Sequence, residues 1–213
     1  MRKTLIASAI GAAVALSACS KPAEDAKTTA AVEQTQAAAP ATEQAAVTNP
    51  LLVKSTLQYE APEFDKIKVE HYQPAMEEGI KQHMAEILTI AGNKEPATFD
   101  NTLVALEKSG ELLTRVSRIF YNLAGSNSNP QRREIQSELA PKMAAHSDNI
   151  NLNPQLFARI KSLYNQRNDL GLDAESVRLI EVYYDRFVRA GAQLTEEQKT
   201  AIRALNEEHS KLT

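Results

Sequence analysis

The sequence has little of what many enzyme active sites are built from. Its 213 residues include no tryptophan, one cysteine and four histidines, and its seven glycines are isolated from one another. A single cysteine excludes an internal disulfide, and dispersed glycines exclude a glycine-rich phosphate loop. No serine lies in a Gly-x-Ser-x-Gly turn, which excludes a hydrolase nucleophile of that kind. No stretch alternates polar and apolar residues as a half-buried strand does.

An excess of basic charge is also lacking. The chain has 24 Lys and Arg against 27 Asp and Glu, a net charge of −3. Loss of Arg2 and Lys3 with the leader described next would leave 22 basic residues against 27 acidic ones, a net charge of −5. Nucleic-acid binding needs a concentrated basic face, so nucleic acid is excluded as a partner.

The first 18 residues have the organisation of a secretory signal peptide. Arg2 and Lys3 precede an apolar run that ends at Leu16-Ser17-Ala18-Cys19. A run of about 7–15 apolar residues is too short to span a bilayer as a mature helix. We therefore predict that residues 1–18 are a lipoprotein signal peptide and that Cys19 is lipidated. The alternative is an ordinary cleavage site followed by an incidental cysteine.

Residues 19–48 are predicted to be a flexible tether. They are mostly Ala, Thr, Gln, Glu and Pro and include no aromatic residue, so they cannot bury enough apolar surface to offset their ordering entropy. Several acyl chains on Cys19 would give stable anchoring. Because Ser20 is not acidic, resemblance to other lipoproteins predicts the outer membrane. We expect an exported, lipid-anchored protein that faces the periplasm.

The remaining segment, residues 49–213, is predicted to be all-α. Residues 49–69 have no sustained period and contain Pro50 and Pro62, which predicts an irregular lead-in. From Pro74 onward apolar residues recur at intervals of three and four, which predicts about six or seven helices. Pro141 lies inside the fourth helical run and is expected to kink or divide it. The expected boundaries are Gly92, Thr98 or Asp100, Ser109-Gly110, Gly125 to Pro130, Asn153-Pro154, Gly171, Asp173 and Thr195.

The histidines do not form a zinc-peptidase motif, which needs two histidines four residues apart with a glutamate beside the first. The four are His71, His83, His146 and His209. His83 and Glu86 are one helical turn apart and could share a metal, although solvated or rim positions are the expected roles. His146 is expected to be a satisfied, partly buried core residue. We predict no catalytic, cofactor-binding or metal-binding residue, and one lipidation site, Cys19.

A series of short strings runs through residues 49–213 with a characteristic order and spacing. The strings are Asn49-Pro50-Leu51-Leu52, Ser55-Thr56-Leu57, Ala61-Pro62-Glu63-Phe64-Asp65, His71-Tyr72-Gln73-Pro74-Ala75, Asn101-Thr102-Leu103, Ala105-Leu106-Glu107, Ser109-Gly110-Glu111-Leu112-Leu113-Thr114-Arg115-Val116, Leu139-Ala140-Pro141-Lys142-Met143-Ala144-Ala145-His146-Ser147-Asp148, Leu156-Phe157-Ala158-Arg159-Ile160 and Phe187-Val188-Arg189-Ala190-Gly191-Ala192. Together they resemble the amino-terminal part of the thimet oligopeptidase family of zinc metallopeptidases, and within it the bacterial peptidyl-dipeptidases. None of the strings is a catalytic signature.

The resemblance implies a nearly all-helical ellipsoid, several times longer than this chain and divided by a deep channel that admits short unstructured peptides. It also implies a zinc ion at the bottom of the channel, held by a His-Glu-x-x-His helix and a further glutamate. There zinc polarises the scissile carbonyl and activates water, and dipeptides leave from the carboxyl end of the substrate. The enzyme is expected to be a monomer.

For this chain, the resemblance implies an amino-terminal helical portion that forms part of one half of the channel. The last helix reaches Thr213 without a stop signal. We therefore expect a chain truncated before the catalytic domain, with no bound zinc and no activity by itself. The alternative is a stand-alone lipoprotein helical interaction module without catalysis. That module would be a monodisperse, cooperatively folding product, whereas a fragment would expose apolar surface.

Overall fold

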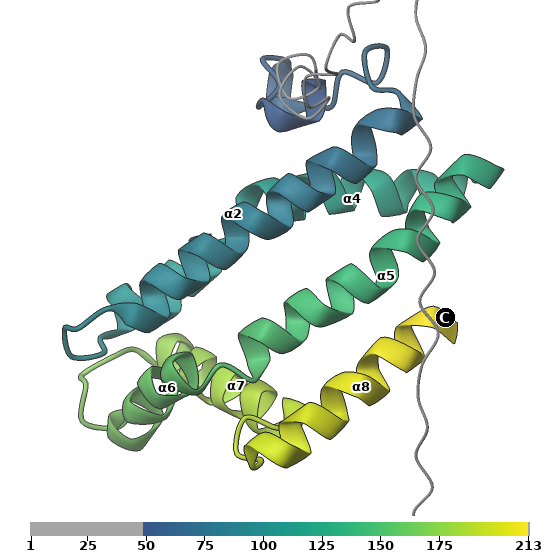
Figure 1. Ribbon diagram of the computed structural model, residues 1–213. Coiled ribbons are helices and arrows are strands. Elements are labelled where there is room, and N and C mark those ends of the chain that lie inside the picture. The colour runs from purple at the N-terminus through teal and green to yellow at the C-terminus, as the bar shows by residue number, and fades with distance from the viewer. Residues whose placement is uncertain (1–48, 213) are drawn as a thin grey trace, which may run out of the picture. The chain divides into compact units, whose positions relative to one another are not determined.

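The computed structural model describes residues 49–212, and within that range it contains helices and no strand (Figure 1). The all-α prediction is confirmed. The α-helices are α2 (Tyr72–Gly92), α3 (Ala105–Lys108), α4 (Glu111–Ser126), α5 (Pro130–Asn151), α6 (Pro154–Gln166), α7 (Ala174–Ala190) and α8 (Glu196–Leu212). Residues 1–18, Cys19 and the rest of 19–48 lie outside the described range. None of the described helices is long and apolar enough to cross a bilayer.

The lead-in before α2 is irregular, as predicted. It consists of three short 3-10 turns, which are η1 (Pro50–Leu52), η2 (Gln58–Glu60) and η3 (Val69–His71). Leu51 is buried against the helices, and the Asn49 side chain donates to the His71 carbonyl at 2.8 Å. Other apolar residues of this segment are exposed, namely Val53, Leu57, Tyr59 and Phe64. Tyr59 also adopts a positive φ within η2.

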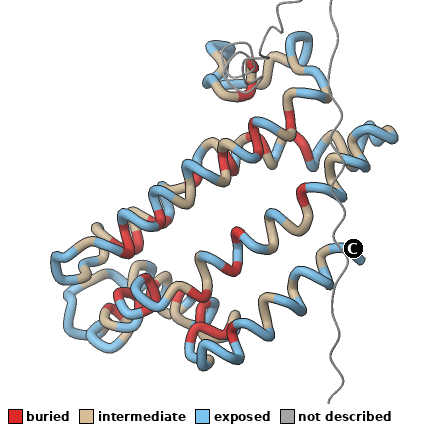
Figure 2. Tube along the Cα trace, viewed as in Figure 1, coloured by how far each residue is buried: buried red, intermediate tan, exposed pale blue. Residues whose placement is uncertain are grey.

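The interior consists of two hydrophobic clusters, both of which include residues of α2 (Figure 2). Near its start, α2 contributes Tyr72 and Met76 to a cluster with α4 and α5. Near its end, it contributes Ile87 and Ile90 to a second cluster with α6, α7 and the π-helix η4 (Phe99–Val104). Apolar residues at intervals of three and four lie on one side of a helix, and here that side is buried. Because α2 joins both clusters, it sets the relative positions of the helices that surround it.

Close packing of α2 on α4 depends on a glycine. A Cβ atom on Gly79 would lie 2.9 Å from Leu113 Cα, a backbone atom of α4. The Arg159 side chain of α6 makes a second long-range connection, because it is buried and donates to the carbonyls of Asn93 and Glu95 and to Asn101 Oδ1. These contacts hold the connection between α2 and η4 against α6.

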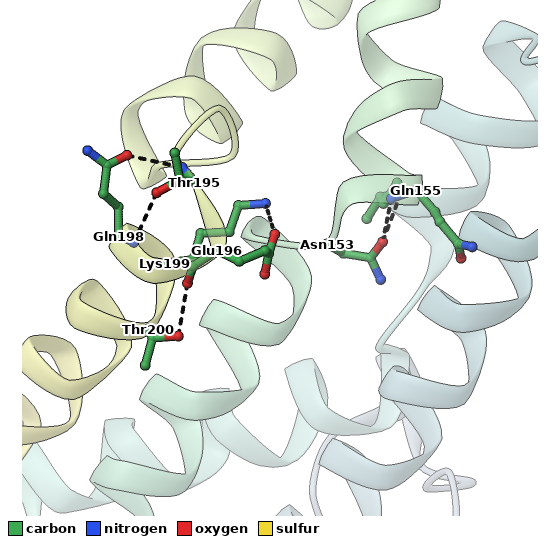
Figure 3. Close-up of polar contacts among 8 residues, drawn as sticks. Asn153, Gln155, Thr195, Glu196, Gln198, Lys199 and Thr200 are labelled. Carbon is green, nitrogen blue, oxygen red and sulfur yellow. Dashed lines mark hydrogen bonds and ion pairs between the residues drawn. The ribbon is translucent and has the colours of Figure 1, made fainter.

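Helix starts follow the side-chain caps that the sequence predicts. Thr98, rather than Asp100, caps η4 by accepting from Asn101 N–H. Asn153 Oδ1 accepts from the N–H groups of Gln155 and Leu156 at the start of α6, and Thr195 exchanges hydrogen bonds with Gln198 at the start of α8 (Figure 3). Each cap satisfies backbone donors that have no partner within the helix. Local sequence therefore sets these boundaries.

Some predicted boundaries differ from the structure. Pro141 does not divide α5, which runs without interruption from Pro130 to Asn151. Packing against α2 on one side and α8 on the other holds this helix together although the proline lacks an N–H. The helix before Gly171 ends earlier, at Gln166, and Gly171 lies in the following loop with a positive φ. Earlier in the chain, α4 continues through Gly125 to Ser126.

Candidate functional site

A pocket of about 530 Å³ lies among α2, α4, α5 and α7, next to the turn between α3 and α4. Pockets that bind small ligands commonly enclose about 300–1,000 Å³. The apolar part of its lining comes from Ile87, Leu106, Leu113, Met143, Ile150 and Phe187. Several of these residues also belong to the hydrophobic clusters, so the floor of the pocket is a surface of the core itself.

Two histidines from different helices meet in the wall of this pocket. His83 Nδ1 on α2 and His146 Nε2 on α5 are 2.9 Å apart, although the residues are 63 positions apart in sequence. On its other side, His83 Nε2 lies 3.2 Å from Ser109 Oγ. The Ser109 hydroxyl donates its one hydrogen to the Leu106 carbonyl at 2.7 Å. Ser109 Oγ must therefore accept from His83 Nε2–H.

This assignment fixes the hydrogens of both rings. With its proton on Nε2, neutral His83 accepts at Nδ1 from His146 Nε2–H. His146 Nδ1 is then an unprotonated acceptor, and it is buried without a hydrogen-bond partner. His146 was predicted to be partly buried, and at 5% exposed it is buried more deeply than that. The prediction that it is satisfied is wrong at this nitrogen, because no donor from the surrounding helices reaches it.

The environment of the pair keeps both rings neutral near pH 7. Burial lowers the pKa of His83, and the nearby Glu86 carboxylate opposes that shift only in part. Burial, followed by the neighbouring His83, lowers the pKa of His146 to about 4. Two imidazoles that share one proton cannot both be charged without losing their hydrogen bond and repelling each other.

The structure gives His83 and Glu86 partners other than a shared metal. Glu86 Oε2 accepts from Gly110 N–H at 2.7 Å, while the His83 ring pairs with Ser109 and His146. Gly110 has φ +71°, and a Cβ there would lie 2.8 Å from the His83 ring, so glycine is required at this turn. Among residues 49–212, no group of three or more His, Cys, Asp and Glu side chains is arranged to hold a metal ion.

A tyrosine and an arginine from α7 complete the opposite wall. Tyr183 Oη donates to Glu107 Oε1 at 2.6 Å, and burial, then that carboxylate, raises the pKa of Tyr183. The guanidinium of Arg186 lies over the Tyr183 ring, 4.9 Å from its centre, a cation–π contact that holds the charge at the pocket. Tyr183 is thereby held as a neutral phenol between the Glu107 carboxylate and the Arg186 guanidinium.

The charged residues that line the pocket are all basic. They are Arg118 of α4 and Arg186 of α7, and the lining contains no aspartate or glutamate. Within the described part of the chain neither arginine forms an ion pair. An adjoining hollow of about 710 Å³ shares Ser109, Thr114 and Arg118 with the pocket. The two hollows therefore meet along the exposed side of α4.

Sequence reasoning did not identify this site. Arg118, Tyr183 and Arg186 carry no motif, and their positions together depend on how α4 packs relative to α7. His71, in contrast, lies away from the pocket, where its Nδ1 accepts from Lys68 N–H. His209 lies in α8. The one available signal for the site was the burial expected for His146, which did not reveal its partner.

The described residues form an all-helical protein, and its curated relatives are peptidases. No family model matches the chain. The chain is 45% identical over 165 residues to dipeptidyl carboxypeptidase of Escherichia coli K12, and 46% identical over 165 residues to that of Salmonella typhimurium. It is also 22% identical over 153 residues to oligopeptidase A of Salmonella typhimurium.

These matches cover 78% of this chain for the dipeptidyl carboxypeptidases and 72% for oligopeptidase A. They confirm the predicted resemblance to the thimet oligopeptidase family, to which both kinds of relative belong. The chain spans about a quarter of the length of the curated relatives it matches, 24% for the dipeptidyl carboxypeptidases and 22% for oligopeptidase A.

Proposed function

We propose that this chain is the amino-terminal portion of a zinc-dependent peptidyl-dipeptidase that releases dipeptides from the carboxyl end of short unstructured peptides. One observation carries the proposal: 45% identity to a dipeptidyl carboxypeptidase over 78% of this chain, which spans 24% of that relative. Because identity at this level covers 165 residues, the helical scaffold is expected to be shared.

Within the enzyme, the role of this chain is to form a wall of the peptide channel and not to perform the reaction. The described residues do not fit the zinc ion, because the histidine pair is committed to Ser109 and to itself, and Glu86 is committed to Gly110. No catalytic step is therefore assigned to this chain, and it is expected to be inactive alone. The complete enzyme is expected to act as a monomer.

We further propose that the protein is exported and anchored by a lipidated Cys19 in the outer membrane, facing the periplasm. The support is the order of Arg2 and Lys3, the apolar run, and Leu16-Ser17-Ala18-Cys19. Metabolic labelling with a palmitate analogue tests this proposal. Label is expected on the chain and is expected to be lost in Cys19→Ser, whereas equal labelling of both chains would contradict lipidation at Cys19.

The nucleotide sequence that continues from Thr213 tests the peptidase proposal directly. We expect an open reading frame that encodes His-Glu-x-x-His and a later glutamate, because these residues are the ligands that the reaction requires. A matched assay compares the chain alone with the product of the longer frame on a fluorogenic peptide. Cleavage by the longer product, blocked by a chelator, is expected. A reading frame without the motif would contradict the proposal.

A further inference from the structure

We propose that the pocket lined by Arg118 and Arg186 binds the carboxylate and the apolar side chain of the last residue of a short peptide. This inference rests on the proposed function for its choice of ligand, and it assigns part of the peptide-binding surface to residues of this chain. Its basis is the pocket itself, namely its charge, its apolar floor and its continuation along α4.

Charge is the first argument. The chain as a whole has net charge −3, yet the pocket presents two guanidinium groups and no carboxylate. Neither arginine forms an ion pair with another described residue, so both are available to an anionic ligand. Guanidinium groups bind carboxylates through paired, charge-assisted hydrogen bonds. The histidine pair is neutral, so it does not compete with the two guanidinium groups for an anion.

Contacts with neighbouring residues hold Arg186 in position. Its guanidinium stacks on Tyr183, and the Tyr183 hydroxyl is fixed by Glu107. A side chain positioned in this way loses less conformational entropy when it binds a ligand than one free in solvent. The arginine is thus arranged at the pocket before a ligand arrives.

The floor and the opening complete the argument. Leu113, Met143 and Phe187 offer an apolar surface beside the arginines, which suits an apolar side chain next to a carboxylate. The adjoining hollow of about 710 Å³ begins at Arg118 and Thr114, and its lining includes both acidic and basic residues. It provides room for the residues that precede the last one. A peptide end fits this combination better than an isolated small anion does.

Titration calorimetry on the full 213-residue chain tests the proposal with three probes. The probes are Ala-Ala-Phe with a free carboxylate, the same peptide with an amidated end, and 3-phenylpropanoate, which has the carboxylate and the ring without a peptide. We expect amidation to weaken binding by about tenfold or more, since charge-assisted hydrogen bonds are lost. We expect phenylpropanoate to bind about tenfold more weakly than the free peptide, because the adjoining hollow stays empty.

The variants Arg118→Met and Arg186→Met are each expected to weaken binding of the free peptide about tenfold and to reduce the difference between free and amidated peptide. Arg189→Met is the matched control, because Arg189 is also exposed on α7 but does not line the pocket. Its affinity is expected to equal that of the parent chain. All three positions are exposed, so circular dichroism is expected to show unchanged folding.

Filling the pocket provides an independent check. Ser147 is exposed and lines the pocket, so Ser147→Trp places a large ring in the space without disturbing the core. It is expected to abolish peptide binding while helicity is retained. Failure of every probe to bind at millimolar concentration, or affinities unchanged by amidation and by the arginine variants, would overturn the proposal. Equal affinity for phenylpropanoate and peptide would also overturn it, in favour of a simple carboxylate site.

These outcomes are separable from the peptidase proposal. Equilibrium binding to this chain does not depend on any residue beyond Thr213. A frame without His-Glu-x-x-His would remove the proposed reaction while leaving the measured binding intact. Conversely, loss of the peptide site would leave the zinc-dependent reaction of the longer frame to be judged by its own assay.

Discussion

Gly79 of α2 lies where only a hydrogen atom fits between two helices. Gly79→Ala would place Cβ 2.9 Å from Leu113 Cα, and a backbone atom cannot move aside as a side chain can. We expect α2 and α4 to separate slightly, at a cost of about 1–3 kcal/mol in the free energy of unfolding. Chemical denaturation monitored by circular dichroism measures the change.

Gly92→Ala is the matched control for this prediction. Gly92 is the last residue of α2, and a Cβ there meets no atom within 4 Å. Alanine is the better helix former, so this change is expected to be neutral or to stabilise the chain by up to about 1 kcal/mol. Equal destabilisation by the two substitutions would show that contact with Leu113 is not the cause.

The His83–His146 pair predicts a dependence of stability on pH. The pKa of His146 is about 4 in the folded chain and about 6.5 when unfolded. Between these values the unfolded state binds a proton that the folded state does not, so stability is fully present above the unfolded pKa and falls as the pH drops below it. For this residue alone we expect a loss of about 2 kcal/mol between pH 7 and pH 5.

His146→Gln isolates that contribution from the titration of carboxylates. A glutamine amide can still donate to His83 Nδ1, where His146 Nε2 donates now, but it does not titrate. We expect the variant to be the less pH-dependent protein between pH 7 and pH 5, as measured by urea denaturation at each pH. Parallel pH profiles for parent and variant would exclude the pair as the source.

At the scale of a single helix, Pro141 lies inside α5 without dividing it. The proline nitrogen cannot donate, so one hydrogen bond of the helix is absent and its ring crowds the preceding turn. Pro141→Ala is expected to restore that bond and to raise the free energy of unfolding by about 1–3 kcal/mol. Denaturation midpoints measure the gain. A lower midpoint would show that the proline ring makes packing contacts that stabilise the fold more than the restored hydrogen bond does.

The accuracy of the predictions differs between local and long-range features. The caps at Asn153, Asp173 and Thr195 were predictable because each depends on side chain and backbone only two or three residues apart. The His83–His146 contact joins positions 63 residues apart and depends on how α2 packs against α5. No periodicity within either helix contains that information.

Pro141 shows why even an element-scale rule can fail. The cost of a proline inside a helix is a local quantity, whereas α5 is held by packing on α2 and α8. Tertiary contacts of this kind outweigh intrinsic propensity in folded proteins. The pocket was unpredictable for the same reason, since Arg118 and Arg186 come together only through the packing of separate helices.

For the whole molecule, α8 presents apolar side chains to solvent. Leu205 is 63% exposed and Leu212 is 80% exposed. They are seven residues apart and so share one face of the helix. Because the chain spans about a quarter of the length of its relatives, we expect it to bind a hydrophobic dye and to self-associate while folded.

The double variant Leu205→Gln with Leu212→Gln is expected to reduce dye fluorescence and association, as measured by light scattering, while helicity stays constant. Leu88→Gln on α2 is the matched control, because Leu88 is 55% exposed and lies on another helix. A parent chain that is monodisperse and dye-free would argue against the fragment interpretation. It would favour the stand-alone interaction module.

The attachment of α8 has a mechanical consequence. This helix rests principally on α5, where Asn206 donates to Asp148 Oδ1 at 2.7 Å (Figure 1). A helix that packs mainly against one neighbour can detach without disrupting either hydrophobic cluster. Under pulling force or brief heating, α8 should therefore detach first and reversibly, and the remaining helices should unfold later.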